Sequence, residues 1–475
     1  MKVILSFDFG ASSGRAIISK FDGYKIELEE VHRFPNEPVL MGGHLYWDFL
    51  RLFNELKTGI RKAKAKYSDI SSIGIDTWGV DYGLLDEFDN LISNPIHYRD
   101  TRTNNIIKDI EKVVSFEEIY NSTGIQYMEF NTLYQLYSDL KYRNNLLKEA
   151  KSLLFIPDLF NFYLTGNKYN EYTEVSTSQM LDANSKNWDF NLLDKLGLPS
   201  TLLQDIIMPG EVWGTLNKEI QAELEVGAIP IIAVGSHDTA SAVAGIPLES
   251  ENSVYLICGT WSLLGIESEN PIINEATLKQ NFTNEGGVCG TIRFLKNING
   301  LWILQQLKKA WCERVCEISF PDIIKAAKAA KAAKNNSFII DPNNAAFMAP
   351  LNIVEEIVNY YAKNGQGTPS GLGEIAISVY NGLTNEFDKV IRNLEGITGN
   401  AVQTINLVGG GIQDELLCQL TADITGKKVI TGPLEASVFG NAIIQLKTLG
   451  VIKSLDEGRK IIKRSIKLTE YIPGK

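Results

Sequence analysis

The segment GSHDTA (235–240) places a histidine and an acid directly after the apolar run PIIAV (230–234). Ligands of α/β proteins usually bind where strands of the sheet end. Asp238 is therefore positioned to accept a proton from a bound hydroxyl group. On spacing alone, the more common role of such an aspartate is to cap the helix that follows. The segment by itself leaves both interpretations open.

Two further segments combine a strand end with glycine and small residues. In DFGASSGR (8–15) an acid precedes a turn whose backbone amides and hydroxyls could approach a phosphate closely, although the same residues could form a simple hairpin. LVGGGIQDELL (407–417) predicts a strand, three glycines and a helix start that suits an anion, or only a tight turn. The apolar face of that helix would carry Ile412, Leu416, Leu420 and Ile424.

The two common phosphate-binding motifs are missing from the sequence. No GxxxxGK[ST] occurs, and no GxGxxG opens a helix after a strand. A P-loop or dinucleotide-binding fold is therefore disfavoured. Acids followed by glycine turns in both halves of the chain suggest instead a nucleotide held between two lobes.

The elements that must position these residues begin with three β-rich runs, at 3–9, 14–21 and 25–34. A helix capped by Asp48 should follow, and then a short strand over 71–78. The predicted apolar face of the helix comprises Phe49, Leu52, Phe53, Leu56, Ile60 and Ala63. This β-β-β-α-β order predicts an α/β fold with a mixed sheet and helices on both of its faces.

A similar series of β-rich runs recurs at 229–235, 253–259 and 262–268. We therefore predict two related domains, 1–245 and 246–475, joined by the exposed connection GIPLESENS (245–253). KAAKAAKAAK (325–334) is predicted to form a solvated helix with a small-residue inner face.

Composition narrows the classes of function. A chain of 475 residues with 44% hydrophobic and 22% charged residues is globular and long enough for two or three domains. The net charge of −11, with no long Lys/Arg stripe, argues against a nucleic-acid partner. The longest apolar runs fall short of the 18 or so residues that span a bilayer, and Asp8 interrupts the first of them, so we expect a cytoplasmic protein with no membrane partner.

Five cysteines, an odd number in a long chain, indicate reduced thiols rather than a disulfide framework. Cys312 and Cys316 could share one helix face. Because the whole chain holds only four histidines, packing thiols are favoured over a zinc site.

Seven segments, taken in order, resemble the FGGY family of carbohydrate kinases nearly end to end, and within it the branch that acts on 6-deoxyketoses. They are DFGASSGR, GIDTWGVDYG (74–83), YRDTRT (98–103), GSHDTA, CGTWS (258–262), KNINGLWILQQ (296–306) and LVGGGIQD (407–414). The resemblance implies a ribonuclease-H-like fold duplicated into two actin-like domains, with ATP and a ketose sugar in the cleft between them.

The resemblance also implies roles for individual residues. Asp238 matches the proton acceptor, which takes the proton of a primary hydroxyl as it attacks the γ-phosphorus of ATP. Asp8 matches an acid near Mg²⁺. The positions that match the ATP site are Ala11, Ser12, Ser13, Gly14, Arg15, Thr260, Gln305 and Gly410. The positions that match the sugar site are Gly79, His237, Asp238, Thr239 and Asn297.

The implied reaction gives a ketose 1-phosphate and ADP, with L-rhamnulose as the first choice of substrate and its epimer L-fuculose as the second. A non-catalytic nucleotide switch built on the same duplicated fold is an alternative of another class. A switch needs no base beside a sugar pocket, so GSHDTA favours the kinase.

Overall fold

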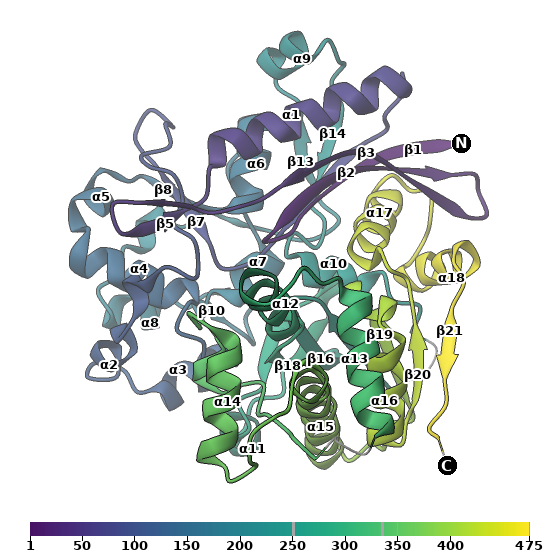
Figure 1. Cartoon of the computed structure of the whole chain (residues 1–475). Helices are drawn as coiled ribbons and strands as arrows, with labels where there is room; N and C mark the ends of the chain where they lie inside the picture. The colour runs from purple at the N-terminus through teal and green to yellow at the C-terminus, as the bar shows by residue number, and fades with distance from the viewer. Residues whose placement is uncertain (249–251, 334–336, 349, 475) are drawn as a thin grey trace. The chain divides into compact units, whose positions relative to one another are not determined.

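The computed structural model describes residues 1–248, 252–333, 337–348 and 350–474 (Figure 1). The chain divides into two compact units. The first comprises Met1–Pro247, Glu267–Phe294 and Ala436–Ile466, and the second comprises Leu248–Ile266, Leu295–Glu435 and Lys467–Lys475. Part of the predicted connection GIPLESENS, residues 249–251, lies outside the described residues.

A six-stranded mixed sheet, in the order β13-β14-β6-β1-β2-β3, forms the centre of the first unit. The predicted meander is confirmed, because β1, β2 and β3 pair antiparallel, whereas β6 runs parallel to both β1 and β14. The bounds are β1 Lys2–Phe9, β2 Ser13–Phe21, β3 Ile26–Pro35, β6 Ile73–Thr77, β13 Val212–Thr215 and β14 Pro230–Ile232.

Helix α1 (Phe49–Lys66) packs on β2 and β3, and Figure 1 shows it lying across these strands. Its predicted cap is confirmed, since the Asp48 side chain accepts a hydrogen bond from the Arg51 amide. The predicted apolar face is buried except for Phe53, which is half-buried. Burial of these apolar side chains against the sheet stabilises the helix more than its intrinsic propensity does.

Helix α17 (Ala436–Thr448) contacts β1 and β6, and it also packs against α10 (Asp238–Ala244). Successive side chains of a strand alternate between the two faces of a sheet. On β1, Phe7 therefore lies under α1, where it would meet a Cβ on Gly59, while Asp8 reaches Ser437 on α17.

The crossing of α10 and α17 is unusually close because glycine lies at the contact on both helices. A Cβ on Gly440 would lie 1.7 Å from the Ser241 carbonyl oxygen, and one on Gly245 would lie 2.0 Å from the Ala436 oxygen. No side chain fits there, so the backbones touch directly.

The rest of the first unit is mainly helical and holds a second apolar core around the antiparallel pair β7 and β8. Its strands are β4 Val39–Met41, β5 His44–Tyr46, β7 Tyr82–Leu85, β8 Ser152–Phe155, β9 Asn170–Glu171, β10 Leu181–Asp182, β11 Asn187–Trp188, β12 Ile206–Ile207 and β17 Thr283–Gly286. Its helices are α2 Ile106–Ile110, α3 Phe116–Thr123, α4 Thr132–Tyr142, α5 Asn144–Glu149, α6 Ile156–Thr165, α7 Tyr172–Thr177, α8 Phe190–Lys195, α9 Lys218–Leu224, α11 Glu275–Lys279 and α18 Leu455–Ser465.

A second sheet has seven strands in the order β17-β18-β16-β15-β19-β20-β21, and most of them belong to the second unit. It repeats the opening of the first sheet, because β15 pairs antiparallel with β16 and parallel with β19. The bounds are β15 Ser253–Cys258, β16 Trp261–Ser268, β18 Ile292–Asn299, β19 Thr404–Val408, β20 Lys428–Thr431 and β21 Thr469–Tyr471.

The helices of the second unit are α12 Trp302–Arg314, α13 Phe320–Ala332, α14 Ile353–Lys363, α15 Leu372–Thr398 and α16 Glu415–Thr425. Within its described part, the alanine-rich segment forms α13 as predicted. Its lysines face solvent to differing degrees, Ala327 is buried, and Gly373 of α15 lies against Ala326 and Ala330.

The prediction that Ile412 lies in the helix after the three glycines was wrong. A 3-10 turn (Gly410–Gln413) intervenes, and α16 begins at Glu415 because the Asp414 side chain accepts hydrogen bonds from the Leu416 and Leu417 amides. Ile412 therefore lies outside the helix, and Ile424 is 40% exposed rather than buried.

Among the described residues, no helix combines the length and apolar character needed for a membrane span. All five cysteines are free thiols.

Candidate active site

Three carboxylates of the first unit lie where three neighbouring parallel strands end. Asp8 is near the end of β1 and pairs in register with Asp76 on β6. Asp238 follows β14, and the bridge between Thr77 and His237 holds its segment beside the end of β6. The topology thus brings together acids that are far apart in sequence, at the edge where α/β sheets usually bind ligands.

The carboxylate of Asp8 is held by two partners. Arg15, its neighbour across the β1-β2 hairpin, approaches Oδ2 to 2.5 Å, and the Ser437 hydroxyl donates to the same oxygen at 3.1 Å. The ion pair is mostly buried, with 17% and 9% of the Arg15 and Asp8 side chains exposed. The arginine compensates the charge of an acid that faces two other acids.

Asp76 is fully buried and was not assigned a role by the sequence reasoning. Its Oδ2 accepts a hydrogen bond from Asn441 Nδ2 at 2.6 Å, while its Oδ1 has no hydrogen-bond partner among the described residues. Burial and the nearby charge of Asp8 raise the pKa of Asp76 well above its usual range. Its position at the end of a predicted strand in SSIGIDTW was the signal that could have identified it.

Asp238 is the first residue of α10, and the N-cap position belongs to His237, which makes no side-chain cap. The helix-cap interpretation of Asp238 is therefore wrong. Its carboxylate accepts a hydrogen bond from the Thr239 hydroxyl at 3.0 Å, and 32% of the side chain is exposed. Burial of the group and the charge of Asp8 raise the pKa of Asp238 to about 7.

His237 adjoins this carboxylate. Its Nε2 lies 3.6 Å from Asp238 Oδ1 and 3.4 Å from Thr239 Oγ1. A Cβ on Gly79 would lie 3.3 Å from the imidazole, so the structure brings Gly79 and His237 together. Burial and the charge of Arg293 hold the pKa of His237 well below its ordinary value, which keeps the ring neutral.

A cluster of buried acids lies behind His237 on and beside α7, and sequence reasoning missed it. The His237 amide donates to the Thr173 hydroxyl, which in turn donates to Glu171. Burial raises the pKa of Glu171 to about 7, and burial together with Asp158 and Glu171 raises that of Glu174 well above its usual range. Burial thus favours the protonated form of Glu174.

The turn at residues 10–12 connects β1 and β2, and the Gly10 amide donates to the Ser13 carbonyl oxygen at 2.9 Å. The hairpin interpretation is thus correct for the fold. Gly14 is required by packing, since a Cβ there would lie 2.2 Å from the Phe34 ring.

The remaining predicted residues lie in the second unit. Thr260 follows β15, and its carbonyl oxygen accepts hydrogen bonds from the amides of Gly300 and Trp302 at the start of α12, the helix that carries Gln305. Gly410 opens the 3-10 turn that follows β19, the parallel neighbour of β15. Asn297 lies on β18. Thr260 and Gly410 thus follow the ends of adjacent strands.

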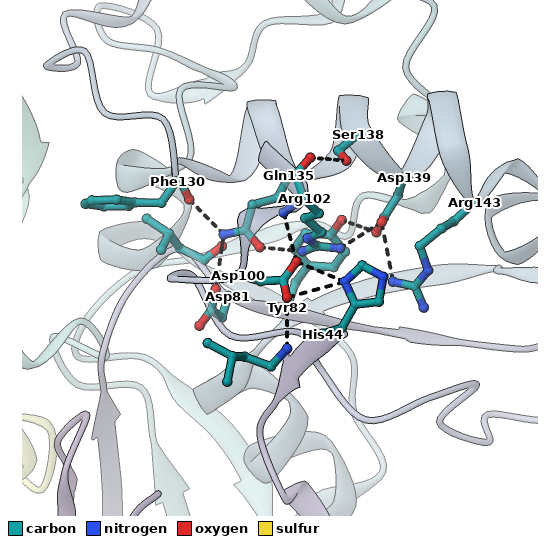
Figure 2. Close-up of polar contacts among 12 residues, drawn as sticks. His44, Asp81, Tyr82, Asp100, Arg102, Phe130, Gln135, Ser138, Asp139 and Arg143 are labelled. Atoms are coloured by element: carbon teal, nitrogen blue, oxygen red, sulfur yellow. Dashed lines mark hydrogen bonds and ion pairs between the residues drawn. The ribbon is translucent and has the colours of Figure 1, made fainter. Parts of the chain in front are cut away.

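A second polar network supports the segment that contains Trp78 and Gly79. Asp81 accepts hydrogen bonds from the indoles of Trp47 and Trp78, at 2.6 and 3.1 Å, and from Gln135 at 3.0 Å. Burial raises the pKa of Asp81 to about 6. Figure 2 shows Gln135 joining Asp81 to a neighbouring cluster, which includes the Arg102–Asp139 ion pair at 2.7 Å. Trp78 is thus held in place by Asp81.

The comparisons with known proteins identify the class. Residues 3–245 match the N-terminal domain of the FGGY family of carbohydrate kinases, and residues 254–449 match its C-terminal domain. The chain therefore belongs to this family, whose members use ATP, and the predicted α/β, actin-like two-domain fold is confirmed. Solved structures with a similar fold include a xylulose kinase from Lactobacillus acidophilus (TM-score 0.83, 18% identity, covering 100% of this chain and 94% of the other). Another is a glycerol kinase from Plasmodium falciparum (0.79, 18%, 99% and 94%).

Within the family, curated relatives named rhamnulokinase match nearly the whole chain. The protein of Oceanobacillus iheyensis is 41% identical over 469 residues, which cover 98% of this chain and 97% of the relative. That of Bacteroides thetaiotaomicron is 39% identical over 466 residues, covering 98% and 95%. The chain is thus a rhamnulokinase-like carbohydrate kinase.

Proposed function

We propose that this kinase transfers the γ-phosphate of ATP to O1 of L-rhamnulose, giving L-rhamnulose 1-phosphate and ADP. The observation that carries the proposal is the partly exposed carboxylate of Asp238, whose pKa burial raises to about 7, beside the neutral imidazole of His237. The choice of sugar rests on the full-length similarity to proteins named rhamnulokinase.

Asp238 acts as the general base. As O1 attacks the γ-phosphorus, the O1–H proton passes to the carboxylate, the new O1–P bond forms, and the bond from the γ-phosphorus to the oxygen of the β-phosphate breaks to release ADP. A pKa near the working pH suits this task, because a substantial fraction of the group is ionised and the carboxylate is still basic enough to take the proton. Gly79, His237, Thr239 and Asn297 hold the sugar in this proposal.

The turn of Ala11, Ser12, Ser13, Gly14 and Arg15 contacts the ATP phosphates, while Thr260, Gln305 and Gly410 contact the nucleotide. Arg15 also forms the 2.5 Å ion pair with Asp8, so its positive charge compensates that carboxylate as well. Backbone amides of glycine-rich turns would supply the remaining phosphate contacts.

Mg²⁺ fits the acidic edge as an ion held mostly by phosphates and water. The buried, unpartnered Oδ1 of Asp76 and the neighbouring Asp8 offer hard oxygen ligands, which Mg²⁺ prefers. Within the described residues no group of three or more acidic, histidine or cysteine side chains is arranged to hold a metal ion. When bound, Mg²⁺ supplies charge neutralisation on the ATP phosphates. The domain limits 1–245 and 246–475 and the cytoplasmic location stay predictions.

The test is a coupled assay of ADP release with L-rhamnulose, L-fuculose, L-ribulose, L-xylulose and glycerol as acceptors. We expect L-rhamnulose to give the highest kcat/KM. A preference for L-fuculose would transfer the proposal to its epimer. No stimulation by any of these acceptors would contradict the proposed reaction and favour a nucleotide switch.

A further inference from the structure

We propose that Arg293 is a positioning residue that fixes the tautomer of His237, so that Nε2 carries the proton and donates a hydrogen bond into the sugar site. The inference deepens the proposed function and rests on it for the sugar. The juxtaposition itself lies wholly within the first unit.

Arg293 is fully buried on β18, and each arm of its guanidinium has a partner. Nε donates to the Gly286 carbonyl oxygen at 2.8 Å, Nη1 lies 3.2 Å from Glu285 Oε2, and Nη2 lies 3.1 Å from His237 Nδ1. Two of these partners lie on β17, in the same unit as Arg293. Two hydrogen bonds and one ion pair leave this planar group little freedom to turn away from the histidine.

The proton position on His237 follows from the chemistry of this contact. A guanidinium has only donors, so the nitrogen that faces it must accept. In a neutral imidazole one nitrogen accepts and the other carries hydrogen. Nδ1 is thus the acceptor and Nε2 the donor, and the positive charge of Arg293 further disfavours protonation of the ring.

The charged and titratable groups that face the ring agree with this arrangement. Glu285 Oε2 lies 3.7 Å from Nδ1, but Arg293 compensates its charge. On the other side, Asp238 Oδ1 lies 3.6 Å from Nε2, and the Thr239 hydroxyl lies 3.4 Å from it. The donor edge of the imidazole therefore faces the candidate base and Gly79.

Two consequences for the reaction follow. A neutral Nε2–H can donate to a sugar hydroxyl oxygen and so orient the sugar relative to Asp238. An imidazolium at 3.6 Å would instead stabilise the ionised form of Asp238 and weaken it as a base. Arg293 thus prevents both the doubly protonated ring and the tautomer with hydrogen on Nδ1.

The direct test is ¹⁵N NMR of the histidine rings in the whole protein, which holds four histidines. His237→Gln identifies the signals of His237. We expect the wild-type spectrum to show hydrogen on Nε2 across pH 5–8, with no protonated form. A spectrum with hydrogen on Nδ1, or a ring that titrates in this range, would overturn the proposal. This measurement does not depend on turnover, so it tests the tautomer of His237 even if the proposed reaction is wrong.

Kinetics of Arg293→Met provide the second test. We expect the KM for the sugar to rise about tenfold while the KM for ATP stays unchanged, and a second ionisation to appear in the pH profile. Arg293→Lys keeps the positive charge but loses the planar guanidinium. We therefore expect its pH profile to be closer to that of the wild type than its KM for the sugar is. Should Arg293→Met fail to fold, the wild-type spectrum and Arg293→Lys carry the test. Arg61→Met is the matched control, because it makes the same change at a 44% exposed arginine of α1 that pairs with Glu223. A folded Arg293→Met with wild-type sugar KM and pH profile would restrict Arg293 to a structural role and overturn the proposal.

Discussion

Asp8 and Asp76 are register partners on the parallel strands β1 and β6, and among the residues that the structure describes only Asp8 has a positively charged partner, Arg15, within ion-pair distance. Two neighbouring carboxylates with one compensating charge cannot both ionise readily, and the buried Asp76 accordingly has the raised pKa. A divalent cation beside these acids would ionise Asp76 and release its proton. In the proposed metal site, the pair would therefore link Mg²⁺ binding to release of a proton from Asp76.

Asp76→Asn tests this link. Asparagine preserves the hydrogen bond from Asn441 but removes the charge, so we expect the Mg²⁺ concentration for half-maximal activity to rise by about tenfold or more. Titration of ADP release with Mg²⁺ measures it. Asp456→Asn, an exposed change on α18, serves as control. Equal Mg²⁺ requirements in Asp76→Asn and the wild type would remove Asp76 from the metal site.

Asp238→Asn should keep sugar and ATP binding but lower kcat by about two orders of magnitude or more, because the group that accepts the O1 proton is lost. Calorimetric titration with sugar and ATP measures binding, and the ADP-release assay measures turnover. Near-wild-type turnover would exclude Asp238 as the base.

The pH dependence of the wild type should reflect the same carboxylate. A base works only when deprotonated, so kcat/KM for the sugar should rise with pH through about 7 and level off above it. For stability, the folded-state pKa of Asp238 lies above that of the unfolded chain. This group therefore destabilises the fold as pH rises from about 4 to about 7. Asp238→Asn should consequently melt at or above the wild-type temperature at pH 8, and a lower value would contradict the raised pKa.

Gly410 and Gly411 offer a matched pair in the second unit. A Cβ on Gly410 would meet nothing within 4 Å, whereas one on Gly411 would lie 2.7 Å from Cys258 Cβ and Sγ. We expect Gly410→Val to raise the KM for ATP with little change in Tm, because its side chain would enter the nucleotide site. Gly411→Val should lower Tm instead. An unchanged KM for ATP in Gly410→Val would remove this glycine from the site.

Gly440→Ala tests the crossing of α10 and α17. The added methyl group would overlap the Ser241 carbonyl, so we expect a loss of unfolding free energy of about 1–3 kcal/mol, as in overpacked cores. Gly396→Ala on α15, where a Cβ would meet nothing within 4 Å, should instead stabilise by about 0.5–1 kcal/mol. Denaturant unfolding compares the two. A Gly440→Ala protein as stable as wild type would contradict the close crossing.

Local patterns predicted much of the fold. Hydrophobic periodicity and the cap at Asp48 sufficed for β1, β2, β3 and α1, since these elements are set by neighbouring residues. The pattern of apolar residues placed Ile412 in a helix, whereas α16 begins at Glu415 because the Asp414 side chain caps it.

Local sequence patterns predicted only part of the candidate site. The motif GSHDTA indicated Asp238. Asp76, however, accepts a hydrogen bond from Asn441, 365 positions away. His237 accepts one from Arg293, 56 positions away. Pairings at such separations depend on the topology of the sheet and on the helix crossing, and no local pattern encodes them.

Helix α17 belongs to the first unit, although it follows most of the second in sequence. During synthesis, Asp76 is made 365 residues before Asn441, which at usual translation rates is roughly 20–70 s. Throughout that interval the nascent first unit lacks α17, including the Ser437 and Asn441 side chains that hold Asp8 and Asp76. Its acidic edge can therefore mature only when translation is nearly complete, and a polypeptide released before residue 441 would carry these acids without those partners.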